Sequence, residues 1–136
     1  LHLSIRRQRQ MCIRDSRLDR TIPLITGDSE GLYRAFSNLA INAMQAMPNG
    51  GSLAISSEQE PSSFMVKITF NDTGIGMDEE TSKSLFNPFF TTKDKGVGLG
   101  MAITQKIIED HRGTIEVISE KGKGATFVLR LPVVKV

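Results

Sequence analysis

A chain of 136 residues is long enough for one domain with a hydrophobic core and too short for two. Apolar residues make up 39% and charged residues 24%, the ordinary composition of a soluble globular domain. There is no apolar run of membrane-spanning length and no secretory signal pattern at the N-terminus. The single cysteine, Cys12, excludes an intramolecular disulfide. We therefore expect a cytoplasmic domain, whose parent protein can be membrane-anchored.

Residues 1–16 differ from the rest of the chain in charge. They hold four arginines and one acid, and the remaining residues, 13 basic and 14 acidic, carry no basic excess that would indicate nucleic-acid binding. The run Met11–Ser16 also reads back as a nucleotide sequence resembling the end of a transposon-based sequencing adapter. We hypothesise that residues 1–16 are a non-native or out-of-context segment, and that the domain proper comprises residues 17–136.

The first expected elements are a short strand and a long helix. Thr21–Ile25 has the composition of a strand, and Pro23 suits an edge position. From Glu30 to Met47, apolar residues recur every three or four positions, which predicts an amphipathic helix. Candidate N-caps lie at Gly27–Ser29, and Pro48–Gly51 stops the helix.

A hairpin, a glycine loop and a short helix are expected next. Leu53–Ser57 and Phe64–Phe70 are rich in β-forming residues and predict the hairpin. The glycine loop Asn71–Gly76 leads into a helix over Asp78–Leu85 that begins with acidic residues. Residues 87–97, which contain proline, threonine, lysine and glycine, are expected to form a mobile loop.

The C-terminal third predicts one helix and two strands. The helix covers Met101–Asp110 and ends by Gly113, and the strands cover Ile115–Ser119 and Ala125–Leu131. The order of elements is not a regular βαβ repeat. It favours an α+β fold, a two-layer α/β sandwich with helices on one face of a mixed, mostly antiparallel sheet.

Three motifs indicate phosphate or nucleotide chemistry. Asn38 and Asn42 lie four residues apart and therefore share one helix face, and an amide oxygen is a hard, neutral ligand that suits Mg²⁺. Asp72-Thr-Gly-Ile-Gly76 ends a strand, where a carboxylate can accept from an exocyclic amine and glycines allow close approach of a flat base. The run Gly96–Gly100 opens a helix, where backbone N–H groups can hold phosphate. Taken alone, each motif has an ordinary explanation. The two asparagines could be solvent-facing, the Asp72 motif could be a common turn, and the Gly96–Gly100 run could be a common helix start.

Taken together and in this order, the motifs resemble those of the histidine-kinase ATPase family, which has the Bergerat ATP-binding fold. The segment Asn38–Ala46 resembles its N box, and Asp72–Met77 its first glycine box. Leu85–Lys93 resembles its F box, and Gly96–Ile103 its second glycine box. The resemblance covers about residues 20–133, whereas the P-loop and dinucleotide-binding fingerprints are absent.

The resemblance implies roles for individual residues. Asn42 would ligate Mg²⁺, and Asn38 would lie close to the phosphates, so that these two form the catalytic pair. Asp72 would accept from the adenine amine, with Gly74 and Gly76 shaping the pocket. The other implied ATP-binding residues belong to the F box and the second glycine box: Phe90, Thr92, Lys93, Gly96, Gly98, Leu99 and Gly100.

The implied reaction is transfer of the ATP γ-phosphoryl group to a histidine on a dimerisation domain of the same protein, with a response regulator downstream. The fragment itself is expected to be monomeric. Neither His2 nor His111 has the surroundings of an acceptor histidine, and His111 is expected to be a structural residue at a helix end. An ATPase of the gyrase and mismatch-repair class would carry a general-base glutamate where Asn38 stands. A serine kinase of the anti-sigma type is the remaining alternative.

Overall fold

The computed structural model describes residues 11–18, 27–60, 64–87 and 100–133. Within these ranges no helix is long and apolar enough to cross a membrane. The elements in chain order are β1 (Met11–Leu18), α1 (Ser29–Gln45), β2 (Gly51–Glu60), β3 (Met65–Asp72), α2 (Glu79–Ser84), α3 (Gly100–Asp110), β4 (Thr114–Ser119) and β5 (Ala125–Pro132).

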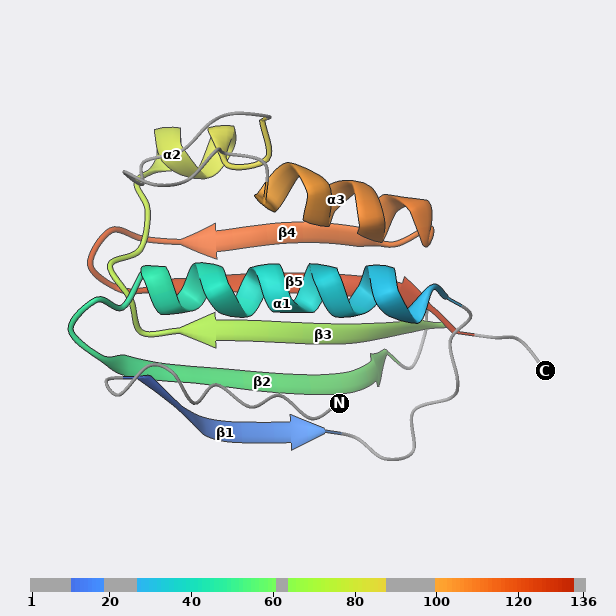
Figure 1. Cartoon of the computed structure of the whole chain (residues 1–136), viewed down its shortest axis with the longest axis horizontal. Helices are drawn as coiled ribbons and strands as arrows, with labels where there is room; N and C mark the ends of the chain where they lie inside the picture. Colours follow the sequence, from blue (N-terminus) through green and yellow to red (C-terminus); the bar gives the residue numbers. More distant parts are fainter. Residues whose placement is uncertain (1–10, 19–26, 61–63, 88–99, 134–136) are drawn as a thin grey trace.

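The strands form one sheet in the order β1-β2-β3-β5-β4 (Figure 1). Neighbouring strands pair antiparallel along β2-β3-β5-β4, and β1 adds a parallel strand beside β2. This arrangement confirms the predicted α+β fold with a mixed, mostly antiparallel sheet. No strand was predicted over Met11–Leu18, and the strand expected over Thr21–Ile25 lies outside the described residues.

The helices α1 and α3 cover one face of the sheet (Figure 1). Side chains alternate along each strand, so the inward positions of β3 and β5 fall in register and form the centre of the core. Phe70 of β3 lies opposite Phe127 of β5, and both are at most 2% exposed. The ring of Phe36 from α1 packs over Phe70, with ring centroids 6.1 Å apart. The core therefore lies between the helices and the sheet, as a two-layer sandwich requires.

The other face of the sheet carries ion pairs. Arg130 of β5 bonds to Glu116 of β4 at 2.7 Å and to Glu60 of β2 at 3.0 Å. Lys67 of β3 pairs with Glu58 of β2 at 3.1 Å. These pairs are partly exposed and contribute little free energy each, but they place charged side chains on the face that has no helix layer among the described residues.

The helix α1 begins at a side-chain cap. The Asp28 side chain accepts a hydrogen bond from the backbone N–H of Glu30, as an N-cap residue does. Its buried face comprises Ala35, Leu39, Ala40 and Ala43, in agreement with the predicted apolar face. The predicted span, Glu30–Met47, differs from the observed one by one residue at the start and two at the end.

The helices α1 and α3 pack side by side and run in opposite directions. The start of α1 meets the end of α3, where the backbone N–H of Asp28 donates to His111 Nε2. Further along α1, Asn38 contacts the first turn of α3 at Gly100. The middle of α1 therefore lies beside the first turn of α3, at Gly100.

Candidate functional site

The carboxylate of Asp72 is held at the end of β3 by two backbone groups. The residue is 4% exposed. Its Oδ1 accepts hydrogen bonds from the N–H of Gly74 at 2.9 Å and of Ala125 at 3.2 Å. Its Oδ2 has no hydrogen-bond partner among the described residues. A carboxyl group fixed in this way can offer Oδ2 to an N–H of a bound molecule.

Burial raises the pKa of Asp72, and the hydrogen bonds from Gly74 and Ala125 oppose the rise. Desolvation disfavours the charged form, whereas donors to that form favour it. A ligand N–H at Oδ2 would act in the same direction as the two backbone donors and favour the ionised carboxylate. The group therefore gains more from a ligand donor than an exposed aspartate would.

The glycine loop that follows Asp72 packs against the end of α1. The N–H of Ile75 donates to the carbonyl oxygen of Ala46 at 2.9 Å. A Cβ on Gly74 would stand 2.5 Å from that same oxygen, closer than any real side chain comes. Gly74 therefore permits the loop to contact α1 about one helical turn after Asn42. The contact brings the first two predicted motifs together.

The β4–β5 turn closes the other side of this loop. The N–H of Gly122 donates to the Ile75 carbonyl at 2.6 Å. Gly76 has a φ of +68°, and an added Cβ would overlap the carbonyl oxygen of Glu120. Gly124 has a φ of +83°, and its added Cβ would overlap the carbonyl oxygen of Asp72. Only glycine fits these two positions without displacement of the backbone.

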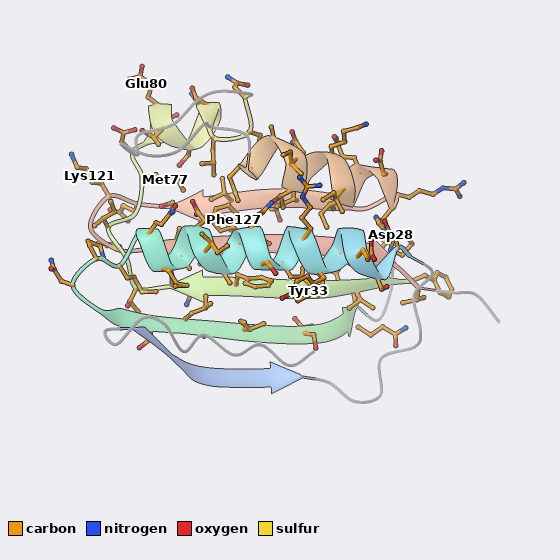
Figure 2. The ribbon with its side chains drawn as sticks, viewed as in Figure 1. Asp28, Tyr33, Met77, Glu80, Lys121 and Phe127 are labelled. Atoms are coloured by element: carbon orange, nitrogen blue, oxygen red, sulfur yellow. The ribbon has the colours of Figure 1, made fainter. Side chains whose placement is uncertain are left out.

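Two hydroxyl groups that the motifs did not single out also hold the loop. Ser119 Oγ accepts from the N–H of Met77 and donates to the Gly124 carbonyl, both at 2.8 Å. Thr73 Oγ1 accepts from the N–H of Ser52 at 3.0 Å. Figure 2 shows Met77 and Lys121 at the end of the sheet away from Asp28. Ser119 continues the inward alternation of Ile115 and Val117, which is the one sequence signal that could have identified it.

The asparagine motif lies on α1, facing the start of α3. Asn38 Nδ2 is 3.4 Å from the Gly100 carbonyl oxygen and 3.3 Å from Thr104 Oγ1. Asn42 follows one turn later and is half-buried. The structure thus joins Asn38 to Gly100, the last glycine of the third motif. No sequence motif pointed to Thr104.

The remainder of the predicted site belongs to the F box and the second glycine box. Six of the implied ATP-binding residues lie outside the described residues, and their roles stay predictions: Phe90, Thr92, Lys93, Gly96, Gly98 and Leu99. A cavity of about 660 Å³ lies elsewhere, between the start of α1 and the end of α3, with Asp28 and His111 in its wall. Neither Asp72 nor Asn38 lines it, so this cavity is separate from the candidate site.

Comparison with known proteins agrees with this geometry. Residues 27–135 match the family described as histidine kinase-, DNA gyrase B- and HSP90-like ATPases. The chain is 41% identical over 113 residues to the sensor histidine kinase ZraS of Escherichia coli (strain K12), a match that covers 83% of this chain and 24% of ZraS. The chain spans about a quarter of the length of such curated relatives.

Solved structures of histidine kinases share the fold. The nucleotide-free catalytic domain of the histidine kinase ThkA aligns with a TM-score of 0.78 and 31% identity, over 90% of this chain and 79% of that chain. Full-length ShkA in complex with AMPPNP aligns with a TM-score of 0.80 and 25% identity, over 93% of this chain and 26% of that chain. ThkA in complex with the response regulator TrrA aligns with a TM-score of 0.74 and 28% identity, over 91% and 34%.

The chain therefore belongs to the histidine kinase-, DNA gyrase B- and HSP90-like ATPase family. Within that family it matches the ATP-binding catalytic domains of sensor histidine kinases. The resemblance drawn from the four motifs is confirmed, and so is the fold that it implied.

Proposed function

We propose that this chain is the catalytic domain of a two-component sensor histidine kinase, and that it binds ATP with Mg²⁺. The observation that carries the proposal is the buried Asp72, whose Oδ1 is held by two backbone N–H groups while Oδ2 faces no described donor. The exocyclic amine of adenine supplies such a donor. The AMPPNP complex of ShkA supports nucleotide binding at this fold.

The amide side chains of α1 fit a divalent cation of the Mg²⁺ type. Mg²⁺ prefers oxygen ligands and is commonly held by few protein groups together with phosphate oxygens and water. Asn42 is the proposed protein ligand, and Asn38 lies on the same helix face one turn earlier. When bound, the ion would neutralise charge on the phosphates during transfer. Gly74 permits the loop to lie beside this end of α1, and Gly76 permits its contact with the β4–β5 turn.

Catalysis would arise from positioning and charge neutralisation, because Asn38 cannot act as a base. A hydrolase needs a group that removes a proton from water. An amide lacks that capacity, and the Asn38 Nδ2 atom is already directed at α3. We therefore infer that the attacking group is an imidazole supplied by a separate dimerisation domain of the parent protein, with a response regulator receiving the phosphoryl group next. The ThkA complex with TrrA supports a partner of that kind.

The test uses γ-labelled ATP and Mg²⁺ with this chain, alone and mixed with the histidine-bearing domain encoded by the parent gene. We expect label on that domain that is lost in acid and kept in base, as a phosphorylated imidazole behaves. Acid-stable label would instead indicate a serine kinase. Rapid steady-state ATP hydrolysis by the chain alone that survives Asn38→Ala would support the hydrolase alternative and contradict the proposal.

We also propose that residues 17–136 form the functional domain and that residues 1–16 are foreign to it. The charge and the nucleotide reading of Met11–Ser16 support this assignment. Recovery of the same codons, uninterrupted, from genomic DNA would contradict it.

A further inference from the structure

Thr104 is a fully buried polar residue between α3 and α1. It lies in the second turn of α3 and has an exposed fraction of 0%. Its hydroxyl donates to the Gly100 carbonyl oxygen, four residues earlier, at 2.8 Å. A hydroxyl has one proton, so that proton is committed to Gly100. The oxygen of Thr104 can then only accept from Asn38, whose amide lies 3.3 Å away.

This arrangement fixes which way the Asn38 amide points. Both atoms that face its inner side, the Gly100 carbonyl oxygen and Thr104 Oγ1, act as acceptors. The Asn38 group turned towards them must therefore be the NH₂ group, because the reverse orientation would place two acceptors against each other. The amide oxygen, Oδ1, is turned away from α3 and accepts no hydrogen bond from any described residue.

We propose that Thr104 is a positioning residue that presents Asn38 Oδ1 to the cation at the phosphate end of the bound nucleotide. The inference rests on the proposed binding of ATP with Mg²⁺. With its NH₂ group committed to α3, Asn38 acts as an acceptor. It contacts Mg²⁺ or a water molecule bound to that ion, rather than donating to a phosphate oxygen. The hydroxyl of Thr104 thereby links α3, which follows the second glycine box, to the helix that carries Asn42.

The experiment compares nucleotide affinity with Mg²⁺ and with a chelator. Thr104→Val keeps the shape of the side chain and removes the hydroxyl, and Thr104→Ser keeps the hydroxyl. The matched control is Thr126→Val, which removes a hydroxyl that donates to Asn71 Oδ1 at 2.9 Å between β3 and β5. ATP affinity is measured by calorimetry for each variant in the full 136-residue chain, and thermal unfolding checks that each variant is folded.

The ratio of ATP affinity with Mg²⁺ to ATP affinity with chelator measures the effect of the cation. We expect this ratio to be about fivefold smaller in Thr104→Val than in wild type, because loss of one ordinary hydrogen bond corresponds to about that factor. The affinity measured with chelator should change by less than about twofold, since it does not depend on the cation. Thr104→Ser should restore the Mg²⁺ effect, and Thr126→Val should leave it unchanged. A purely structural role of Thr104 would lower both affinities together.

The contrary outcomes are separable. If wild-type chain gains affinity with Mg²⁺ and Thr104→Val gains as much, the positioning role is wrong and the proposed function stands. If Thr104→Ser fails to restore the effect, the hydroxyl is not the responsible group, and the inference also fails. If wild-type chain binds no ATP with or without Mg²⁺, the proposed function is overturned and the inference with it.

Discussion

The imidazole of His111 joins the start of α1 to the end of α3 through Asp28. His111 Nε2 accepts the backbone N–H of Asp28 at 2.9 Å, and its Nδ1 lies 2.7 Å from the Ile107 carbonyl oxygen. The ring is thus held at both nitrogens by backbone groups at the two helix ends. The structural role expected for His111 is confirmed. With both ring nitrogens bonded, His111 is also unsuited to accept phosphate.

The neighbouring residue, Arg112, offers a test of backbone strain. It adopts a φ of +62°, in the left-handed region that glycine tolerates best. We expect Arg112→Gly to increase the free energy of unfolding by about 0.5–1 kcal/mol, because relief of strain exceeds the added entropy of the unfolded glycine. Arg112→Ala keeps a Cβ and should bring no such gain. Urea unfolding of both variants measures the difference, and equal stabilities would refute the strain argument.

The adenine role of Asp72 can be tested by exchanging one atom. In Asp72→Asn, the amide oxygen can keep the bonds from Gly74 and Ala125, so that an NH₂ group replaces Oδ2. A donor would then face the donor of adenine, and we expect ATP affinity to fall at least about tenfold. Calorimetry measures the loss, with thermal unfolding to show that the variant is folded. Unchanged affinity in a folded variant would remove Asp72 from the site.

The same substitution predicts a pH effect on stability. Because the pKa of Asp72 is raised in the folded protein, the fold favours the protonated carboxyl. Wild-type protein therefore loses stability as the pH rises from the ordinary carboxyl range through the higher folded pKa. An amide side chain cannot titrate, so Asp72→Asn should become more stable relative to wild type between about pH 4 and pH 7. Urea unfolding at several pH values gives the difference, and a constant difference would contradict the prediction.

Two glycines with nearly the same positive φ separate strain from crowding. Gly122 and Gly124 have φ values of +84° and +83°, but only Gly124 has atoms in the way of a Cβ. Gly122→Ala should cost about 1–2 kcal/mol from strain alone. Gly124→Ala should cost more than that, because its Cβ would overlap the Asp72 carbonyl oxygen and displace the carboxylate. It should also weaken ATP binding, whereas Gly122→Ala should not. Similar losses from both variants would show that crowding at Asp72 is unimportant.

The proposed start of the domain at residue 17 predicts the effect of deleting residues 1–16. Removal of residues 1–16 should leave ATP affinity within about twofold of wild type, because substitutions remote from a site usually act independently of it. The strand β1 pairs only with β2 among the described strands, and Asn38, Asn42 and Asp72 lie on other elements. Calorimetry on the shortened chain measures this, with unfolding as a check. A loss of binding in a folded protein would move the domain boundary towards the N-terminus.

The sequence was most informative where structure depends on near neighbours. The candidate caps at Gly27–Ser29, the apolar period of α1 and the β-forming composition of β3 are local patterns, and each predicted an element within a few residues. The motifs also singled out Asp72 and Gly74, because glycine after a strand-end carboxylate is visible in a single short segment, and their role in nucleotide binding stays a prediction. These predictions did not depend on knowing which segments meet in space.

The contacts that hold the site were not accessible in this way. Asn38 meets Thr104 across 66 positions of the chain, and Met77 meets Ser119 across 42. A threonine inside a helix carries no local mark of such a contact. The alternation of β4 points Ser119 inward but does not indicate its partner. The same holds for β1, whose parallel pairing with β2 spans the whole of α1.

The two ends of α1 can be altered independently. About 25 Å of helix separates the His111 contact at Asp28 from the glycine loop at Ala46. Free-energy changes at well-separated positions usually add. A stabilising change such as Arg112→Gly would therefore offset the free energy of unfolding that destabilising substitutions near Asp72 remove. Variants that would otherwise unfold could then be purified and assayed for nucleotide binding. The end of the molecule at Asp28 and His111 is also a suitable place for a fluorescent label or a surface tether, because neither would touch the proposed nucleotide site at Asp72.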